Sequence, residues 1–146
     1  MADSQFELRD KNGNVFFFNL FKDSEGWIYS CWSGSVNDEQ VKLGAAQNLK
    51  LIKEHKCGFI LNDNRELSGN WTASNDWLEE EYLPLAAKEG LKYVAHVFSP
   101  KFITKFSAVD LGVRDLPVIF ETFDNMQDAQ EWLRERIKPK LSNDEV

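Results

Sequence analysis

The residues best suited to chemistry gather in one polar segment, residues 63–74, which follows a short apolar stretch. Arg65 could pair with a carboxylate or a phosphate through two parallel hydrogen bonds. Trp71 is an unusual residue for a loop, and an aromatic side chain there can anchor a protein partner. We therefore predict a partner-binding or ligand-binding loop with the candidate residues Asp63, Asn64, Arg65, Ser68 and Trp71.

The same segment also has a structural interpretation. Asp63 and Asn64 are residues that shape turns by accepting hydrogen bonds from nearby backbone N–H groups. In this interpretation, Trp71 folds back onto the core instead of facing a partner. Both interpretations place residues 63–74 in a loop after the carboxyl end of a strand, where open α/β sheets bind their ligands.

No catalytic or metal-binding motif is present. His96 lies in an apolar strand and His55 at a helix end, and no HxH, CxxC or HExxH spacing occurs, whereas a metal site needs converging ligands. Cys31 and Cys57 lie in apolar stretches, where a free cysteine behaves as a small hydrophobic residue. The acidic run at 79–81 is on a predicted helix, where adjacent side chains diverge. We therefore expect no metal, no cofactor and no enzymatic activity.

Charge and composition narrow the class of protein further. The chain has 146 residues, of which 42% are hydrophobic, and its net charge is −7. Nucleic acids bind basic patches, and no cluster of more than two Lys or Arg occurs, so we expect no nucleic-acid partner. There is no signal-peptide pattern and no apolar run of about 20 residues. We expect a cytoplasmic protein without a membrane span.

Three segments rich in β-forming residues open the chain, at 6–8, 15–21 and 27–32. Short turns at 11–14 and 22–26 separate them, and strands joined by such turns can only be antiparallel neighbours. The aromatic residues here are too many for one face of a sheet, because alternate residues of a strand face opposite sides. We predict that a second copy of the chain covers part of this surface in a homodimer. The aromatic residues are Phe16, Phe17, Phe18, Phe21, Trp27, Tyr29 and Trp32.

Helices and strands then alternate. Asn37 and Gln40 have the spacing of a capping box, at the start of a helix that we predict to end at Gly58. Asp124 is the predicted cap of the last helix, and the chain is expected to fray after Pro139. The other predicted elements are strands at 59–62, 93–98 and 117–123, a helix at 77–90 interrupted at Pro84, and a short helix after Ser99 that contains Phe102, Ile103 and Phe106.

The fold class that follows is α/β, with a mixed β-sheet whose N-terminal antiparallel meander is followed by alternating βα units. We expect a single domain over residues 1–140 and a polar C-terminal tail over 141–146.

Five short motifs occur in order between residues 16 and 133. They are Trp32-x-Gly34, Leu61-Asn62-Asp63, Trp77-Leu78-x-x-Glu81-x-Leu83-Pro84, Ala86-x-x-x-Gly90-Leu91-Lys92, and Phe123-Asp124 before Ala129-x-x-Trp132-Leu133. In this order and spacing they resemble the bacterial STAS-like domains grouped as SpoIIAA-like. That group is related to anti-sigma factor antagonists and to Sec14-like folds.

The resemblance implies a four- or five-stranded sheet flanked by helices, in a protein that acts by binding partner proteins. Anti-sigma factor antagonists are phosphorylated on a serine after a strand, which implies Ser68 or Ser74 here, although neither stands in the family's acidic-serine turn. We therefore predict a non-enzymatic protein-interaction or regulatory module. The alternative is a carrier of a small, lipid-like apolar ligand, because the related lipid-transfer folds enclose one beneath their helices.

Overall fold

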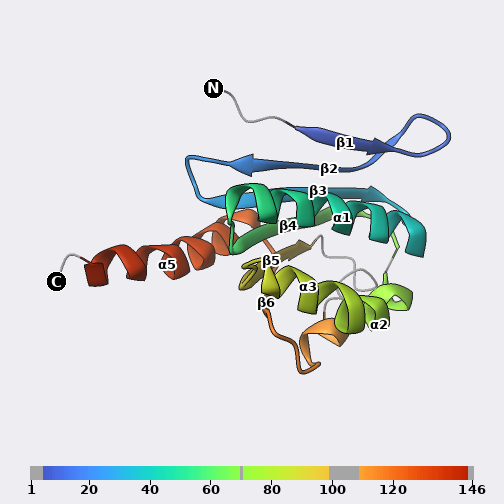
Figure 1. Cartoon of the computed structure of the whole chain (residues 1–146). Helices are drawn as coiled ribbons and strands as arrows, with labels where there is room; N and C mark the ends of the chain where they lie inside the picture. Colours follow the sequence, from blue (N-terminus) through green and yellow to red (C-terminus); the bar gives the residue numbers. More distant parts are fainter. Residues whose placement is uncertain (1–4, 70, 99–108, 145–146) are drawn as a thin grey trace.

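A sheet of six strands, in the order of the sequence, forms the centre of the described part of the chain (Figure 1). The computed structural model describes residues 5–69, 71–98 and 109–144. The first three strands are antiparallel neighbours, and the last three run parallel to the third. The predicted mixed sheet with an N-terminal meander is confirmed. The strands are β1 (Phe6–Arg9), β2 (Val15–Lys22), β3 (Trp27–Gly34), β4 (Phe59–Leu67), β5 (Tyr93–Phe98) and β6 (Ile119–Phe123).

Helices cover the two faces of the sheet. Helix α1 and the run from η1 to α3 pack on one face, which we call the α1 face, and α5 packs on the other, the α5 face (Figure 1). Ile60 of β4 belongs to the core of the α1 face, and its neighbour Leu61 belongs to the core of the α5 face. The helical elements are α1 (Asp38–His55), η1 (Thr72–Ser74), α2 (Asn75–Trp77), η2 (Leu78–Tyr82), α3 (Leu83–Lys88) and α5 (Met126–Asp144).

Strand β4 extends well beyond the predicted strand. The sequence predicts a loop from residue 63 onward, but β4 continues to Leu67, so Asp63, Asn64 and Arg65 are strand residues. Asp63 pairs with Cys31 of β3 on one side and with Val97 of β5 on the other. The prediction of a loop is wrong here because residues that favour turns in isolation have ladder partners in the sheet: Asp63 on both sides and Asn64 on β5.

The caps of α1 agree with the sequence at its start and differ at its end. Asn37 Oδ1 accepts from the Gln40 N–H at 2.8 Å and Gln40 Oε1 accepts from the Asn37 N–H at 3.0 Å, which is the predicted capping box. At the other end, the left-handed residue is Lys56, with a φ of 51°, and not Gly58.

The last helix is capped one residue later than predicted and is longer. Asn125 Oδ1, not Asp124, accepts from the Asp128 N–H at 2.8 Å, which sets the first turn of α5. The backbone is helical to Asp144, where the sequence predicts fraying after Pro139 and a tail from residue 141. A proline removes one helical hydrogen bond, and the helix here continues past it. The predicted helix with Phe102, Ile103 and Phe106 lies outside the described residues.

The second predicted helix is interrupted, as expected, near Pro84. In η2 the Leu83 N–H donates to the carbonyl of Leu78, five residues earlier, which is a π turn. Pro84 follows at once and has no N–H with which to close an ordinary helical turn. Such π turns occur often at functional sites, and this one forms part of a cavity wall.

Candidate functional site

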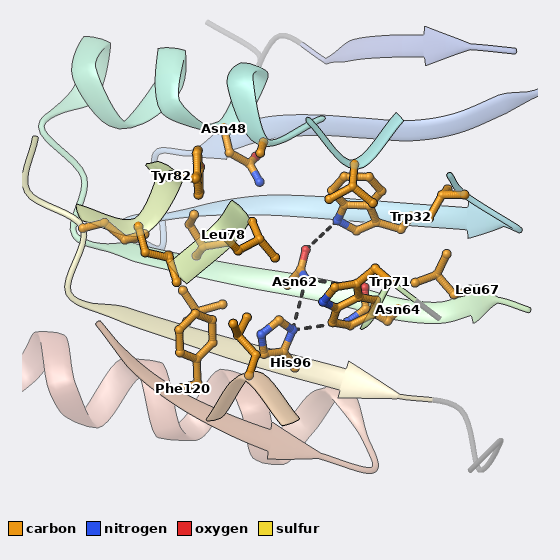
Figure 2. Close-up of a pocket in the computed structure, with 18 residues that line it drawn as sticks. Trp32, Asn48, Asn62, Asn64, Leu67, Trp71, Leu78, Tyr82, His96 and Phe120 are labelled. Carbon is orange, nitrogen blue, oxygen red and sulfur yellow. Dashed lines mark hydrogen bonds between the residues drawn. The ribbon is translucent and has the colours of Figure 1, made fainter. Parts of the chain in front are cut away.

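A cavity lies between the α1 face of the sheet and the helices that cover it (Figure 2). Its empty volume is about 650 Å³, which includes open solvent at its mouth. Its walls are mainly aliphatic and aromatic, and no Asp, Glu, Lys or Arg is among the described residues that line it. The described lining is therefore uncharged and largely apolar.

Polar side chains of β4 and β5 form the floor of this cavity. The amide nitrogens of Asn62 and Asn64 lie 3.1 and 3.3 Å from Nδ1 of His96, as Figure 2 shows. Asn62 Oδ1 accepts a hydrogen bond from Trp32 Nε1 at 2.8 Å. The indole N–H can only donate, so the Asn62 oxygen must face Trp32 and its NH₂ group must face His96.

This orientation determines where His96 carries its proton. Nδ1 accepts from amide N–H groups, so the proton is on Nε2. Burial lowers the pKa of His96 to about 3, so the ring is neutral. His96 is 4% exposed, and its Nε2 has no hydrogen-bond partner in the part of the chain that the structure describes. A buried donor without an acceptor costs about 1–3 kcal/mol.

Aromatic rings hold the His96 ring in place. Phe120 of β6 stacks on it with a centroid distance of 5.3 Å and an interplanar angle of 11°. Trp71 stacks on it at 5.9 Å and 27°. Trp71 is 8% exposed and lines the cavity. The interpretation in which Trp71 folds onto the core is confirmed, and the residue is not an exposed anchor.

The helical wall adds two polar groups. Tyr82 of η2 is buried, and its hydroxyl has no hydrogen-bond partner within the described residues. Burial also raises the pKa of Tyr82, so the hydroxyl stays neutral. Asn48 of α1 accepts at Oδ1 from Asn19 Nδ2 at 2.9 Å and from Ser30 Oγ at 2.8 Å. Figure 2 shows the amide nitrogen of Asn48 turned toward the cavity.

Two of the predicted site residues lie on the opposite face of β4. Arg65 Nε and Nη2 donate to the two carboxylate oxygens of Asp63, both at 2.9 Å. Tyr29 donates to Asp63 Oδ2 at 2.5 Å. Burial by itself raises the pKa of Asp63, but these hydrogen bonds outweigh it and the pKa is below its ordinary value. Because Nε and Nη2 of the Arg65 guanidinium both donate to Asp63, this edge of the guanidinium is not available to another carboxylate or a phosphate.

The structure therefore divides the predicted binding residues. It brings Asn64 and Trp71 to the cavity. Ser68 is exposed and follows β4. Ser74 is 1% exposed, and its hydroxyl donates to Asp38 Oδ1 at 2.8 Å. A phosphorylation site at Ser74 does not fit this burial, while Ser68 stays a prediction.

Sequence reasoning missed the residues that shape the cavity floor. It assigned His96 a structural role and gave Asn62 and Tyr82 none. Two signals point to them: Asn62 and Asn64 are spaced by two, as on one face of a strand, and His96 is the polar residue of an otherwise apolar strand.

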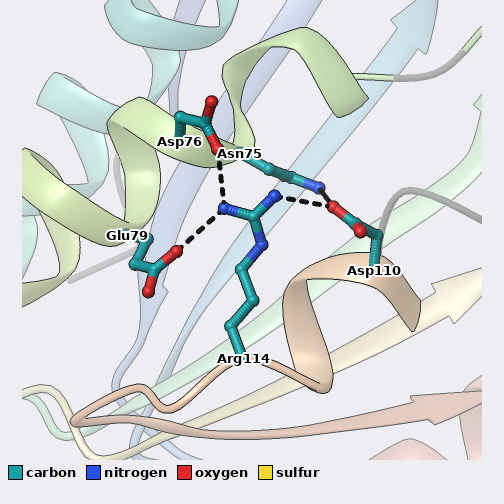
Figure 3. Close-up of polar contacts among 5 residues, drawn as sticks. All are labelled: Asn75, Asp76, Glu79, Asp110 and Arg114. Atoms are coloured by element: carbon teal, nitrogen blue, oxygen red, sulfur yellow. Dashed lines mark hydrogen bonds and ion pairs between the residues drawn. The ribbon is translucent and has the colours of Figure 1, made fainter.

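A cluster of charged side chains joins the segment around Arg114 to α2 and η2 (Figure 3). Arg114 donates to Asp76 and Glu79 at 2.9 Å and to Asp110 at 3.0 Å. Leu111 lies between the charged residues of this segment, is 3% exposed and lines the cavity. The ion pairs thus hold the segment of Leu111 against α2 and η2.

Neither a metal cluster nor a membrane-spanning helix is found in residues 5–69, 71–98 and 109–144. No group of three His, Cys, Asp or Glu in these ranges could hold a metal ion. None of the helices described there is both long and apolar enough for a membrane crossing. Cys31 and Cys57 are free and buried, in agreement with their predicted role as small hydrophobic residues.

No protein-family model matches the chain, and no curated protein matches it. The chain is similar to an uncharacterised DUF3478-family protein with a SpoIIAA-like fold from Shewanella loihica PV-4, over 90% of this chain and 94% of the other, with 18% sequence identity and a TM-score of 0.45. A similarity of this size assigns no function to this chain.

Proposed function

We propose that this chain is a non-catalytic module that binds a small, largely apolar molecule in the cavity of the α1 face. The observation that carries the proposal is His96 Nε2 at the floor of an apolar cavity, a buried donor without an acceptor among the residues that the structure describes. An empty apolar cavity and an unpaired buried donor both lower the stability of a fold. A bound molecule offsets both terms at once.

The side chains of the cavity support binding without chemistry. His96 has a pKa of about 3, and its Nδ1 is occupied by amide N–H groups, so it is a poor general base at neutral pH. Tyr82 has a raised pKa and is therefore no better as an acid. No nucleophile stands beside a base among the lining residues that the structure describes.

Binding of a partner protein, the function first predicted from the sequence, has less support. Arg65 is paired with Asp63 and Trp71 is buried, so neither offers the contact that was predicted. Phe17 and Trp27 are 0% and 2% exposed within the chain itself, which weakens the argument for a covering second copy. A protein partner and a homodimer stay predictions without an assigned surface.

Filling the cavity tests the proposal. Ala45 of α1 lines the cavity and is buried, whereas its neighbour Ala46 is exposed. Ala45→Leu enlarges a side chain inside the cavity, and Ala46→Leu makes the same change at the surface. With the uncharged apolar dye Nile red as the probe, we expect Ala45→Leu to bind at least tenfold more weakly, a loss of about 1.4 kcal/mol. Ala46→Leu is expected to bind like the wild type.

Two further measurements complete this experiment. Urea unfolding of both variants shows whether Ala45→Leu is folded under the conditions of the titration. Native mass spectrometry of the purified wild-type chain is expected to show an added mass that Ala45→Leu lacks. Absence of Nile red binding to the wild type, or equal binding to all three proteins, would contradict the proposal.

A further inference from the structure

The described residues that line the cavity supply hydrogen-bonding groups but no fixed charge. Its two ionisable side chains, His96 and Tyr82, are neutral because burial disfavours their charged forms. A charged group on a ligand would therefore be buried without a counter-charge, which costs far more than burying a neutral group. The lining thus favours an uncharged ligand.

The cavity floor requires an acceptor from that ligand. Trp32 fixes the amide of Asn62, and Asn62 in turn directs an N–H at Nδ1 of His96. The other tautomer would place an Nδ1–H against this N–H, so His96 keeps its proton on Nε2 and can only donate there. A hydrocarbon would leave this donor unpaired, whereas a carbonyl oxygen would accept from it.

Tyr82 adds a second and less selective contact. Its hydroxyl is on the helical wall, while His96 is on the sheet, and neither atom has a partner among the described residues. A hydroxyl both donates and accepts, so it tolerates either kind of polar group. His96 is therefore the residue that discriminates between ligands.

Together these observations go one step beyond the proposed function, on which the inference rests. We propose that the ligand is an uncharged, largely apolar molecule that places a carbonyl-type oxygen on Nε2 of His96. The chemical class includes ketones, neutral amides and esters with an aliphatic or aromatic body. It excludes free carboxylates and plain hydrocarbons as preferred ligands.

A matched series of naphthalene derivatives tests the inference on the full-length wild-type chain. The probes are the methyl ketone, the ethyl derivative and the carboxylic acid of naphthalene, titrated at neutral pH, where the acid is ionised. One net hydrogen bond predicts that the ketone binds roughly three- to tenfold more tightly than the ethyl derivative. The carboxylate is expected to bind most weakly, because no counter-charge meets it.

Variants then assign the preference to His96. His96→Phe is expected to bind the ketone and the ethyl derivative with equal affinity, while Tyr82→Phe, the matched control, retains the preference for the ketone. The ranking on the wild type stands as a test by itself even if His96→Phe does not fold.

The outcomes separate the two proposals. A wild-type chain that binds Nile red but shows no preference for the ketone, or prefers the carboxylate, overturns this inference and leaves the proposed function standing. Failure to bind the ketone while Nile red binds also overturns it. Failure of the wild type to bind Nile red overturns the proposed function itself, and this inference with it.

Discussion

The two faces of β4 bury polar side chains in opposite ways. On the α5 face, Asp63 accepts from Arg65 and Tyr29, and the charges compensate each other inside the chain. On the α1 face, the Asn62 amide donates to Nδ1 of His96, and Nε2 of the same ring has no partner among the described residues. Asp63 therefore has its hydrogen-bond partners within the chain, whereas its neighbour Asn62 orients a histidine that still has a hydrogen bond to donate.

This difference indicates where binding is to be expected. Asp63 and Arg65 are predicted from the sequence as binding residues, yet their side chains bind each other within the fold. His96 has no charge at neutral pH, yet it has a hydrogen bond to give. The changes below test the contrast, and they run from the largest expected effect to the smallest.

Arg65→Ala should have the largest effect on stability and none on binding. It leaves the buried carboxylate of Asp63 with Tyr29 as its remaining side-chain donor. Breaking a buried ion pair costs about 3–5 kcal/mol, and the Arg65 side chain is 46% exposed, so we expect a loss of about 2–3 kcal/mol in urea unfolding. Glu66→Ala, at the exposed neighbour, is the control. A weakened affinity for Nile red in Arg65→Ala would show that the two faces are not separate.

The pH dependence of stability distinguishes the two faces of β4, because His96 and Asp63 lose their stabilising effect in different pH ranges. The pKa of His96 falls from 6.5 to about 3 on folding, so between these values the unfolded chain binds the proton and the folded chain does not. The stabilisation is complete above pH 6.5 and is lost as the pH falls. At about 1.4 kcal/mol per pH unit, roughly 2 kcal/mol is lost between pH 6.5 and about pH 5.

His96→Phe should remove this part of the loss, as urea unfolding across the pH range would show. Asp63, whose pKa is lowered from 3.8, contributes stability that is lost only at more acidic pH, below its ordinary value. Equal slopes for the wild type and His96→Phe between pH 6.5 and about pH 5 would mean that His96 is not a buried neutral ring.

Gly44→Ala should disturb the cavity floor from a distance. A Cβ at Gly44 would overlap the ring of Trp32, and displacement of Trp32 frees Asn62 from its fixed orientation. Such overpacking costs about 1–3 kcal/mol, and we expect weaker Nile red binding together with a change in tryptophan fluorescence. Gly112→Ala is the matched control, because a Cβ there meets nothing within 4 Å. Unchanged binding in Gly44→Ala would argue against the role of Trp32.

Two tyrosine variants give the smallest and most closely matched comparison. Tyr29→Phe removes a hydroxyl that donates to Asp63 and should lower the stability by about 1 kcal/mol. Tyr82→Phe removes a hydroxyl that has no partner within the described ranges, and should leave the stability unchanged or raise it slightly. Equal losses in urea unfolding would mean that the Tyr82 hydroxyl has a partner in solution.

The elements that could be predicted from sequence are those set by local signals. The strands of the meander follow from short turns, and the Asn37–Gln40 cap from side chains three residues apart. The end of β4 could not be predicted in this way, because Asp63 and Asn64 favour turns unless neighbouring strands pair with them, as β3 and β5 do with Asp63 and β5 does with Asn64. The cavity floor depends on contacts between β3, β4 and β5. No local sequence pattern predicts the two hydrogen bonds that connect Trp32 to Asn62 and Asn62 to His96.

Nitrogen NMR of the chain labelled in its histidines tests the central claim most directly, with His96→Phe to assign the signals. We predict that His96 is the neutral tautomer with its proton on Nε2, that it does not titrate between neutral pH and about pH 5, and that the Nε2–H signal moves downfield when the naphthyl methyl ketone is added. A proton on Nδ1, or an Nε2–H signal that the ketone leaves unchanged, would contradict the account.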